Sequence, residues 1–394
     1  MAASMGLTNP VLSLYVKGFT ESTFLVGFFF TTFALGRTLV TLPASHASDR
    51  WGRKLPIVAG ALIEAVGSWG IAFAPNYQLL ILTRLIQGIG SGVYTSGAFL
   101  VVADLTTPQE RGRVNSLFQG SILLGLTISP VIGGVMAKQL GLRAPIALGA
   151  FLGLATALLV LIRFPSALGK TNLRQSESTG VEWLAPEPEG VREKVLNPNF
   201  ILITLAAFFI FVARAGSRDT LLPLLGHDLL GLDESVLGLL FTLIALFNLI
   251  TIPLAGYISD TRGRKPAVSL GLALNGLALL LIAASHSQAV FFLGSLILGA
   301  GKGFGEPTTV VYVTDVSPSK RYGTSFGLFL TLRDLGLLVG PVVLGKLADL
   351  VNLRFPLYAN ALSMLVLTLV FGFLAAETLK KPARRTLDSE KAAC

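Results

Sequence analysis

The sequence predicts an all-helical, polytopic membrane protein built from two six-helix halves. Of its 394 residues, 52% are hydrophobic and 13% are charged, and the mean hydropathy is +0.70, a balance typical of proteins with many membrane spans. Apolar runs close to the ~20 residues that cross the hydrocarbon layer recur along the chain. One polar motif also occurs twice, 211 positions apart, which indicates a duplicated half.

Twelve apolar runs predict twelve helices. The runs do not alternate in polarity as the strands of a membrane barrel do, which favours helices over strands. In the first half they lie near 1–18, 22–47, 55–73, 77–104, 111–138 and 142–163. In the second half they lie near 197–226, 233–258, 266–284, 288–315, 322–348 and 353–376.

A single long polar segment, 164–196, separates the two sets of runs. It is rich in Pro, Glu and Ser and lacks a sustained apolar period, so we interpret it as a linker. The sequence therefore predicts an N-terminal bundle at 1–163, a C-terminal bundle at 197–376 and a tail at 377–394. The single cysteine, Cys394, excludes an intramolecular disulfide.

The basic residues indicate the orientation in the membrane. One set of loops, with the linker and tail, carries 20 Lys and Arg residues, whereas the opposite loops carry 5. The positive-inside rule then places the linker, the tail and both termini in the cytoplasm, and we expect a monomer in the plasma (inner) membrane. The net charge of +9 is mostly this topology signal. Because the bases are scattered over short loops, no nucleic-acid partner is expected.

The motif that occurs twice is part of a much longer repeat. "SDRWGRK" at 48–54 and "SDTRGRK" at 259–265 share one register, and the same offset relates the glycines at 88, 90 and 92 to those at 299, 301 and 303. Agreement from 49 to 145 indicates two homologous halves, as in secondary transporters. Six helices per half is an even number, so the halves share an orientation and are related by an axis along the membrane normal.

These motifs resemble those of the major facilitator superfamily over nearly the whole chain. The two repeats are similar to the family's G-x-x-x-D-R-x-G-R-K loop, and "RLIQGIGSG" at 84–92 is similar to its helix 4 motif. "GLTISPVIGG" and "GLLVGPVVLG" resemble the antiporter signature, with Gly125, Pro130, Gly133, Gly134, Gly336, Gly340 and Pro341. The resemblance implies a proton-coupled transporter of the 12-helix drug antiporter branch, without a cofactor.

The resemblance also implies a cytoplasmic gate that latches the halves in the outward-facing state. The expected gate residues are Asp49, Arg50, Gly52, Arg53, Lys54, Asp104, Arg113, Asp260, Gly263, Arg264 and Lys265. The alternative is that these charges only anchor the topology. The glycines at 52 and 263 suit the tight turn between antiparallel helices.

The sequence contains no motif for ATP binding and none of the catalytic motifs that we considered. Phe164 stands where a phosphate-binding loop ending in "GKT" would need its first glycine, and the chain has neither H-E-x-x-H nor G-x-S-x-G. We therefore expect a transporter driven by an ion gradient and not an enzyme, with no metal site.

Ten charged residues fall inside or near the spans. A charge inside the membrane is energetically costly, so each of these residues is a candidate functional residue. They are Arg37, Glu64, Arg84, Arg214, Arg218, Asp219, Lys302, Glu306, Arg333 and Asp334. In the family, helices 1, 4, 7 and 10 line the cavity, which implies a substrate cavity formed by Arg84, Arg214, Arg218, Asp219, Lys302 and Glu306. Lys302 and Glu306 are four residues apart and can pair. Structural ion pairs are an equal alternative for Arg37, Glu64, Arg333 and Asp334.

A carboxylate beside apolar walls can load and unload a proton. Glu306 is our first choice for proton coupling, followed by Asp219 and Glu64, and the helix 4 resemblance implies that Arg84 modulates proton affinity. The ten residues sum to +2, which favours an anionic or zwitterionic solute. The sequence thus leaves open drug export, organic-anion or metabolite transport, and a receptor that does not transport.

The register of the halves predicts a short first helix. Met1 is equivalent to Val212, well inside the seventh run. About 16 residues remain before the first loop and cover about 24 Å, less than the roughly 30 Å hydrocarbon core. We expect the cytoplasmic third of helix 1 to be absent, either truly or through the assigned start, so that it ends inside the bilayer.

Overall fold

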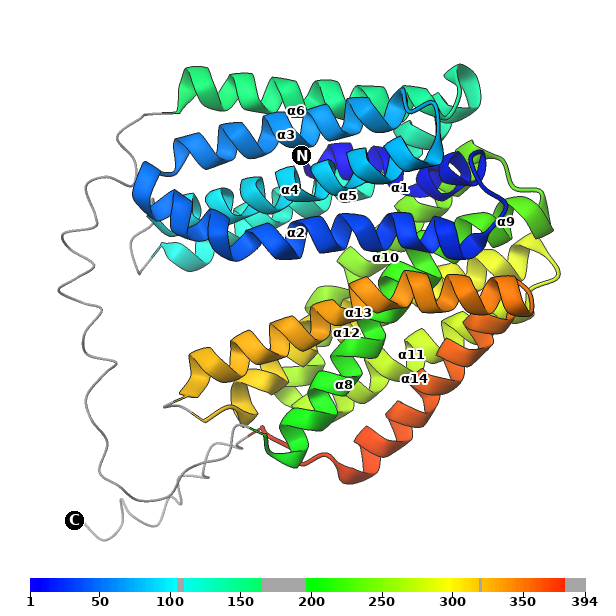
Figure 1. The fold of residues 1–394 in the computed structure, drawn as a ribbon. Coiled ribbons are helices and arrows are strands. Elements are labelled where there is room, and N and C mark those ends of the chain that lie inside the picture. Colours follow the sequence, from blue (N-terminus) through cyan, green and yellow to red (C-terminus); the bar gives the residue numbers. More distant parts are fainter. Residues whose placement is uncertain (105–109, 165–195, 319–320, 380–394) are drawn as a thin grey trace, which may run out of the picture.

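The computed structural model describes residues 1–104, 110–164, 196–318 and 321–379, and within these ranges it contains helices and no strand (Figure 1). The first half comprises α1 Ala2–Lys17, α2 Thr23–Trp51, α3 Lys54–Ala72, α4 Tyr77–Asp104, α5 Arg111–Leu140 and α6 Arg143–Arg163. The second comprises α8 Pro198–Val212, η2 Ala213–Leu221, α9 Leu222–Leu230, α10 Glu234–Thr261, α11 Arg264–Ala284, α12 Gln288–Val316, α13 Tyr322–Leu350 and α14 Phe355–Leu374. Each of the twelve predicted runs thus contains a helix. Within the described residues, ten spans are long and apolar enough to cross a membrane.

The seventh span is interrupted by a π-helical segment. α8, η2 and α9 form one continuous span of 33 residues. Inside η2, the Thr220 hydroxyl donates to the Ala215 carbonyl five residues earlier, at 2.8 Å. The Asn197 side chain caps the start of the span by accepting from Phe200 N at 2.8 Å, and Gly231 ends it in the left-handed conformation. The equivalent α1, Ala2–Lys17, has 16 residues.

Glycines on the fourth helix of each half allow close packing on both of its neighbours. A Cβ on Gly88 would lie 2.3 Å from the Phe33 carbonyl oxygen on α2, and one on Gly90 would lie 2.2 Å from Glu64 N on α3. In the second half, Gly299 and Gly301 of α12 meet α10 and α11 in the same way. The repeated glycines therefore set helix spacing within each bundle.

Two equivalent seams join the halves: α2 packs against α13, and α5 packs against α10. A Cβ on Gly134 of α5 would lie 2.4 Å from the Glu234 carbonyl oxygen. One on its repeat counterpart, Gly345 of α13, would lie 2.6 Å from the Thr23 carbonyl oxygen. Gly27 against Pro341 and Gly238 against Pro130 repeat the correspondence. The 211-residue register of the sequence is thus a two-fold relation in space.

Polar contacts close the halves at the end opposite the linker. Lys17 forms an ion pair with Asp228, and Lys138 forms one with Asp233 at 2.8 Å. The Asp349 carboxylate accepts from Thr23 N at 2.7 Å, from Phe24 N at 3.0 Å and from the Ser22 hydroxyl, so it caps α2 from the other half. We call Lys17, Ser22, Lys138, Asp228, Asp233 and Asp349 the loop-end latch.

The latch follows the internal symmetry. Lys17 and Asp228 are equivalent positions, 211 residues apart, so their contact lies close to the two-fold axis that relates the halves. Lys138 is equivalent to Asp349, and Ser22 to Asp233, so the two outer contacts are also related. The Lys138 ammonium and then the Ser235 hydroxyl hold the pKa of Asp233 well below its usual range.

The halves diverge toward the linker end (Figure 1). Gly120 on α5, Gly256 on α10, and Gly323 and Gly327 on α13 have no atom within 4 Å of an added Cβ, among the described residues. These are the helices that contact the other half closely through glycines nearer the loop-end latch. The described parts of the two halves are therefore joined at one end and farther apart at the other.

Candidate functional site

A pocket lies within the second half, and the seventh and tenth spans contribute its charged side chains. Arg214 and Arg218 come from η2, and Lys302 and Glu306 come from α12. The apolar part of the lining consists of Ile210, Ala213, Ile244 and Leu298, with Asn275 from α11. Four of the six residues expected in a substrate cavity thus meet in one place.

The π-helical segment orients two of the cations. The Arg214 guanidinium lies 3.4 Å from a Glu306 oxygen, and their side chains are 35% and 25% exposed. Arg218 instead pairs with its neighbour Asp219 at 2.6 Å. Charged side chains that lie deep in the bundle yet remain exposed to this extent indicate a surface that water can reach.

Lys302 does not form the expected pair with Glu306. In the described residues it has no ion pair, although it shares a helix with Glu306 and lies within electrostatic range of it. Arg214 reaches Glu306 from another helix and takes that place. Sequence spacing alone identified the i,i+4 neighbour and missed the partner that helix packing supplies.

Arg84 lies in an aromatic box and does not line this pocket. Its guanidinium carbon is 4.7 Å from the Phe29 ring centre and 4.5 Å from that of Phe33, within cation–π range. One Nη donates to Gln87, which donates to the Ser68 hydroxyl at 2.8 Å. The residue is 7% exposed, and its Nε has no partner in the described structure.

Glu64 is the most buried of the candidate coupling carboxylates. It is 3% exposed on α3, and its carboxylate has no hydrogen bond or ion pair in the part of the chain that the structure describes. The Met1 ammonium, Arg84 and Arg37 lie within electrostatic range. Its repeat counterpart is Asn275, the α11 residue of the pocket, which donates to Gly271 O at 2.8 Å.

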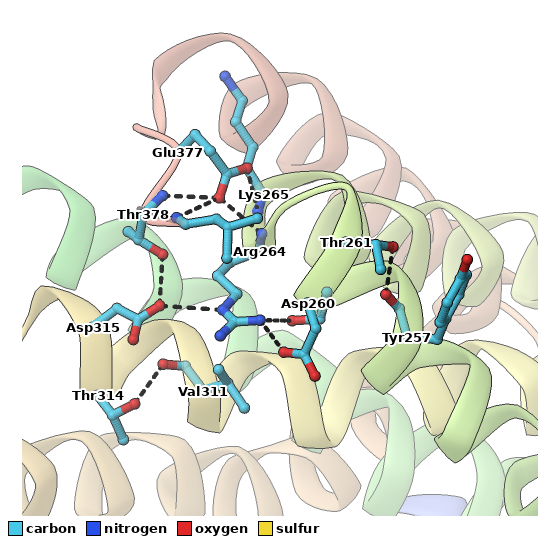
Figure 2. A network of polar contacts seen from close by, with 12 residues as sticks. Tyr257, Asp260, Thr261, Arg264, Lys265, Val311, Thr314, Asp315, Glu377 and Thr378 are labelled. Carbon is cyan, nitrogen blue, oxygen red and sulfur yellow. Dashed lines mark hydrogen bonds and ion pairs between the residues drawn. The ribbon is translucent and has the colours of Figure 1, made fainter. Parts of the chain in front are cut away.

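The second-half residues expected in the gate form a network of polar contacts (Figure 2). Arg264 pairs with Asp260, and its Nε lies 3.3 Å from an Asp315 oxygen at the end of α12. Glu377, which follows α14, accepts from Arg264 N at 2.8 Å and from Lys265 N at 3.2 Å. Thr378 donates to Asp315 at 2.9 Å. This network joins α10, α11, α12 and the segment after α14, and among the described residues its members all belong to the second half.

In the first half, Gly52 has a φ of +83°, and its counterpart Gly263 has +124°, so both turns use a backbone conformation that favours glycine. Arg53 makes a polar or electrostatic contact, and Lys54 begins α3. The side chains of Asp49, Arg50, Asp104 and Arg113 lie outside the described set, as do nearly all of the linker 164–196 and most of the tail.

The antiporter-like motif serves helix contacts. A Cβ on Gly125 would lie 3.2 Å from Ala3 N, and one on Gly133 would lie 1.9 Å from the Leu7 carbonyl oxygen, both on α1. Gly336 and Gly340 approach α8 in the same way, and Gly134 contacts α10 across the seam. Pro130 and Pro341 each lie inside a continuous helix.

Sequence reasoning missed the acidic half of the loop-end latch. Asp228, Asp233 and Asp349 lie in loops or helix ends where few charges occur. The 211-residue offset could have found them, because it places each one opposite a basic residue or a helix start of the other half.

Comparisons with known proteins agree with this geometry. A sequence model of the Major Facilitator Superfamily matches residues 1–233 and again 207–393. The multi-drug resistance efflux pump PmrA homolog of Lactococcus lactis is 23% identical, over 95% of this chain and 91% of the relative. The quinolone resistance protein NorA of Staphylococcus aureus is 24% identical, over 90% and 88%.

Solved structures share the fold. The peptide transporter POT in complex with sulfate aligns with a TM-score of 0.75 at 16% identity, over 94% of this chain and 91% of that one. A bacterial homologue of the human lysosomal transporter Spinster, in an inward-facing and occupied conformation, also aligns with a TM-score of 0.75 at 16% identity, over 95% and 93%.

Proposed function

Because the chain belongs to the Major Facilitator Superfamily and is therefore a membrane transporter and not an enzyme, we propose that it exports a small organic solute of the drug type in exchange for protons. The relatives named for drug efflux and quinolone resistance cover almost the whole chain. They support this class of solute. The protein acts by alternating access, as expected for two homologous halves.

One observation carries the proposal: a charged pocket lies inside a molecule whose described halves are joined by polar contacts at the end opposite the linker. Arg214, Lys302 and Glu306 lie in membrane spans, where unneeded charge is costly. The loop-end latch joins the two halves at one end, whereas glycines of α5, α10 and α13 nearer the linker end have no close neighbour among the described residues. A solute site with one open side is one of the two states that alternating access requires.

We assign the open side to the cytoplasm, because the linker end carries most of the basic residues. Both termini are then cytoplasmic, the membrane is the cell's plasma (inner) membrane and the protein works as a monomer. The domains are 1–163 and 197–376, joined by the linker 164–196 and followed by the tail 377–394. The structure is then the inward-facing state.

The gate fits this state. With the linker end open, Arg264 has its partners within its own half. On closure of that end, the cluster at 49–54 and its repeat at 260–265 come together with the other half and stabilise the outward-facing state. A topology anchor would keep the same contacts in both states.

Proton coupling uses carboxylates in the spans. Glu306 is the first carrier because Arg214 already holds it at 3.4 Å and it borders the pocket. Asp219, bound to Arg218, is second, and Glu64, buried without a partner in the described residues, is third. Arg84 lies within electrostatic range of Glu64 and thereby changes the proton affinity of that carboxylate.

The test uses the purified protein in proteoliposomes with an imposed proton gradient. Ethidium and a fluorescent quinolone serve as solutes, and a pH-sensitive dye reports protons. We expect the gradient to drive solute movement against its concentration, and a solute gradient to move protons. A protonophore should abolish both. Solute binding without any flux would instead indicate a receptor, and flux that ignores the proton gradient would overturn the coupling.

A further inference from the structure

The pocket of the second half carries an excess positive charge. Two of its cations are already neutralised, Arg214 by Glu306 at 3.4 Å and Arg218 by Asp219 at 2.6 Å. Lys302 has no ion pair in the described part of the chain and lines the same pocket. The pocket is therefore one negative charge short of balance.

The fold does not require this charge. The equivalent helix of the first half, α4, carries Ser91 where α12 carries Lys302, and Thr95 where α12 carries Glu306. Both helices pack on their neighbours through the same spaced glycines, Gly88 to Gly92 and Gly299 to Gly303. Because the uncharged version packs equally closely, the lysine serves something other than packing, and an intramembrane charge without a structural role marks a solute site.

The surroundings of the charged groups indicate what the remainder of a negatively charged solute would be. Ile210, Ala213, Ile244 and Leu298 form apolar walls, and Phe211 and Phe241 lie under the guanidinium groups of Arg214 and Arg218 at 5.6 and 6.0 Å. A site with mostly apolar walls and one unbalanced cation binds an amphiphilic molecule that bears one acidic group.

We propose that the transported solute carries a carboxylate and that the Lys302 ammonium binds it. The remainder of the solute lies against the apolar walls, so the substrate class is an amphiphilic organic acid or a zwitterion. This inference rests on the proposed transport function and narrows its solute. Lys302 is then the residue that sets specificity, whereas Glu306 serves the proton.

The test compares matched probes on the full-length protein. A panel of aromatic carboxylic acids, including a quinolone, is paired with the corresponding primary amides, which keep the shape and lose the charge. Binding is measured by calorimetry in detergent, and gradient-driven flux in proteoliposomes. In the wild-type protein we expect acids to bind about tenfold or more tightly than their amides, the range of a hydrogen bond between charged groups.

Variants assign the preference to one residue. Lys302→Met should reduce the affinity for acids to that for amides and leave amide binding unchanged, while Lys302→Arg keeps the preference. Lys346→Met, which removes an exposed ammonium near the loop-end latch, should behave as wild type. Equal binding of acids and amides to the wild type would overturn the proposal even if Lys302→Met does not fold. So would an equal loss of both in that variant.

The proposed function fails in a different way. If the wild-type protein moves ethidium under a proton gradient but shows no preference for acids, transport stands and the carboxylate inference is wrong. If the gradient moves neither class of probe while acids still bind more tightly than amides, the site is as proposed and proton-coupled transport is wrong.

Discussion

At the scale of single residues, Glu306 is placed between two positive charges from different helices. Arg214 reaches it from η2, and Lys302 lies one turn away on α12. A proton on Glu306 removes the negative charge that holds Arg214, so protonation changes the charge of the pocket and the contacts of η2 together. This links a titration to a helix of the transport path.

We therefore expect Glu306→Gln to abolish proton-driven accumulation of solute and to leave equilibrium exchange partly intact, because the amide keeps the shape but cannot carry the proton. Accumulation should fall to the level of empty vesicles. Uptake with and without the gradient measures it, and Glu234→Gln at the start of α10 is the control. If the Gln variant accumulates solute as well as wild type, Glu306 is not the carrier and its pair with Arg214 is structural.

A second residue-scale prediction concerns the gate turn. Gly263→Ala should destabilise the protein by roughly 1–3 kcal/mol, because φ is +124° and the new Cβ would lie 2.2 Å from a Glu377 oxygen. Gly256→Ala, seven residues earlier in open space, is the matched control and should be neutral or stabilising. Thermal unfolding followed by size-exclusion chromatography compares them. Equal melting temperatures would show that the turn adapts without cost.

The sequence identified the charged residues of the site but not all of their partners. Lys302 and Glu306 were recognised because charge in an apolar run stands out. Their pairing was not predictable, because whether Arg214 or Lys302 meets Glu306 depends on the rotation of α8–η2 against α12. Asn275 was missed because a neutral amide gives no such signal, although its equivalence to Glu64 points to it.

At the scale of helices, the sequence predicted the spans because the bilayer sets their length and composition. It did not predict the π-helical segment in the seventh span. That segment follows the apolar stretch Pro198–Val212 and coincides with "ARAGSRDTL". A π insertion has no residue pattern of its own and is common at functional sites, and here it positions Arg214 and Arg218 together.

Helix spacing supplies the next prediction. Gly90→Ala should cost about 1–3 kcal/mol, because its Cβ would lie 2.2 Å from the backbone nitrogen of Glu64, which cannot move without the whole of α3. Gly120→Ala on α5 should be tolerated, because the added Cβ would have no atom within 4 Å among the described residues. Melting temperatures in detergent measure the difference. No difference would mean that α3 and α4 separate freely and that the shared glycine register has no packing role.

At the scale of the whole molecule, the two halves share a packing scheme and differ in where they place charge. Their seams are equivalent, glycine for glycine, yet Lys302 and Glu306 have Ser91 and Thr95 as counterparts, and Arg84 has Ser295. The duplication thus supplied a symmetric frame, while the proposed solute pocket and the first-choice proton carrier, Glu306, lie in the second half. Sequence reasoning recovers the frame from the 211-residue offset.

The state of the molecule was not predictable from sequence. Two conformations that exchange during transport differ by only a few kcal/mol, so residue patterns cannot decide between them. The structure decides it through contacts between distant segments, such as Lys17 with Asp228 and Asp349 with the start of α2. Each joins residues from different halves and so forms only when one end is closed.

We expect the loop-end latch to set the fraction of molecules whose halves are closed at that end. Asp228→Lys replaces the attraction to Lys17 by repulsion, at a position where the equivalent residues of the two halves meet. An exposed ion pair contributes about 0.2–1 kcal/mol, so the ratio of open to closed loop ends should rise by a factor of about 1.4 to 5. The double variant Lys17→Asp with Asp228→Lys restores opposite charges and should return the ratio to the wild-type value.

Spin labels at Leu140 and Val351, both exposed at the ends of α5 and α13, report the separation of the halves in proteoliposomes after Cys394 is replaced by Ser. We expect the longer distance to gain population in Asp228→Lys and to lose it again in the double variant, because only the charge product changes between them. A third variant, Lys346→Asp, alters charge near the same end without touching Asp228 and serves as the control. If the single and double variants give the same distances, the Lys17–Asp228 pair does not set the conformational equilibrium, and the Lys138–Asp233 pair, the Asp349 cap on α2 and the helix seams hold that end closed.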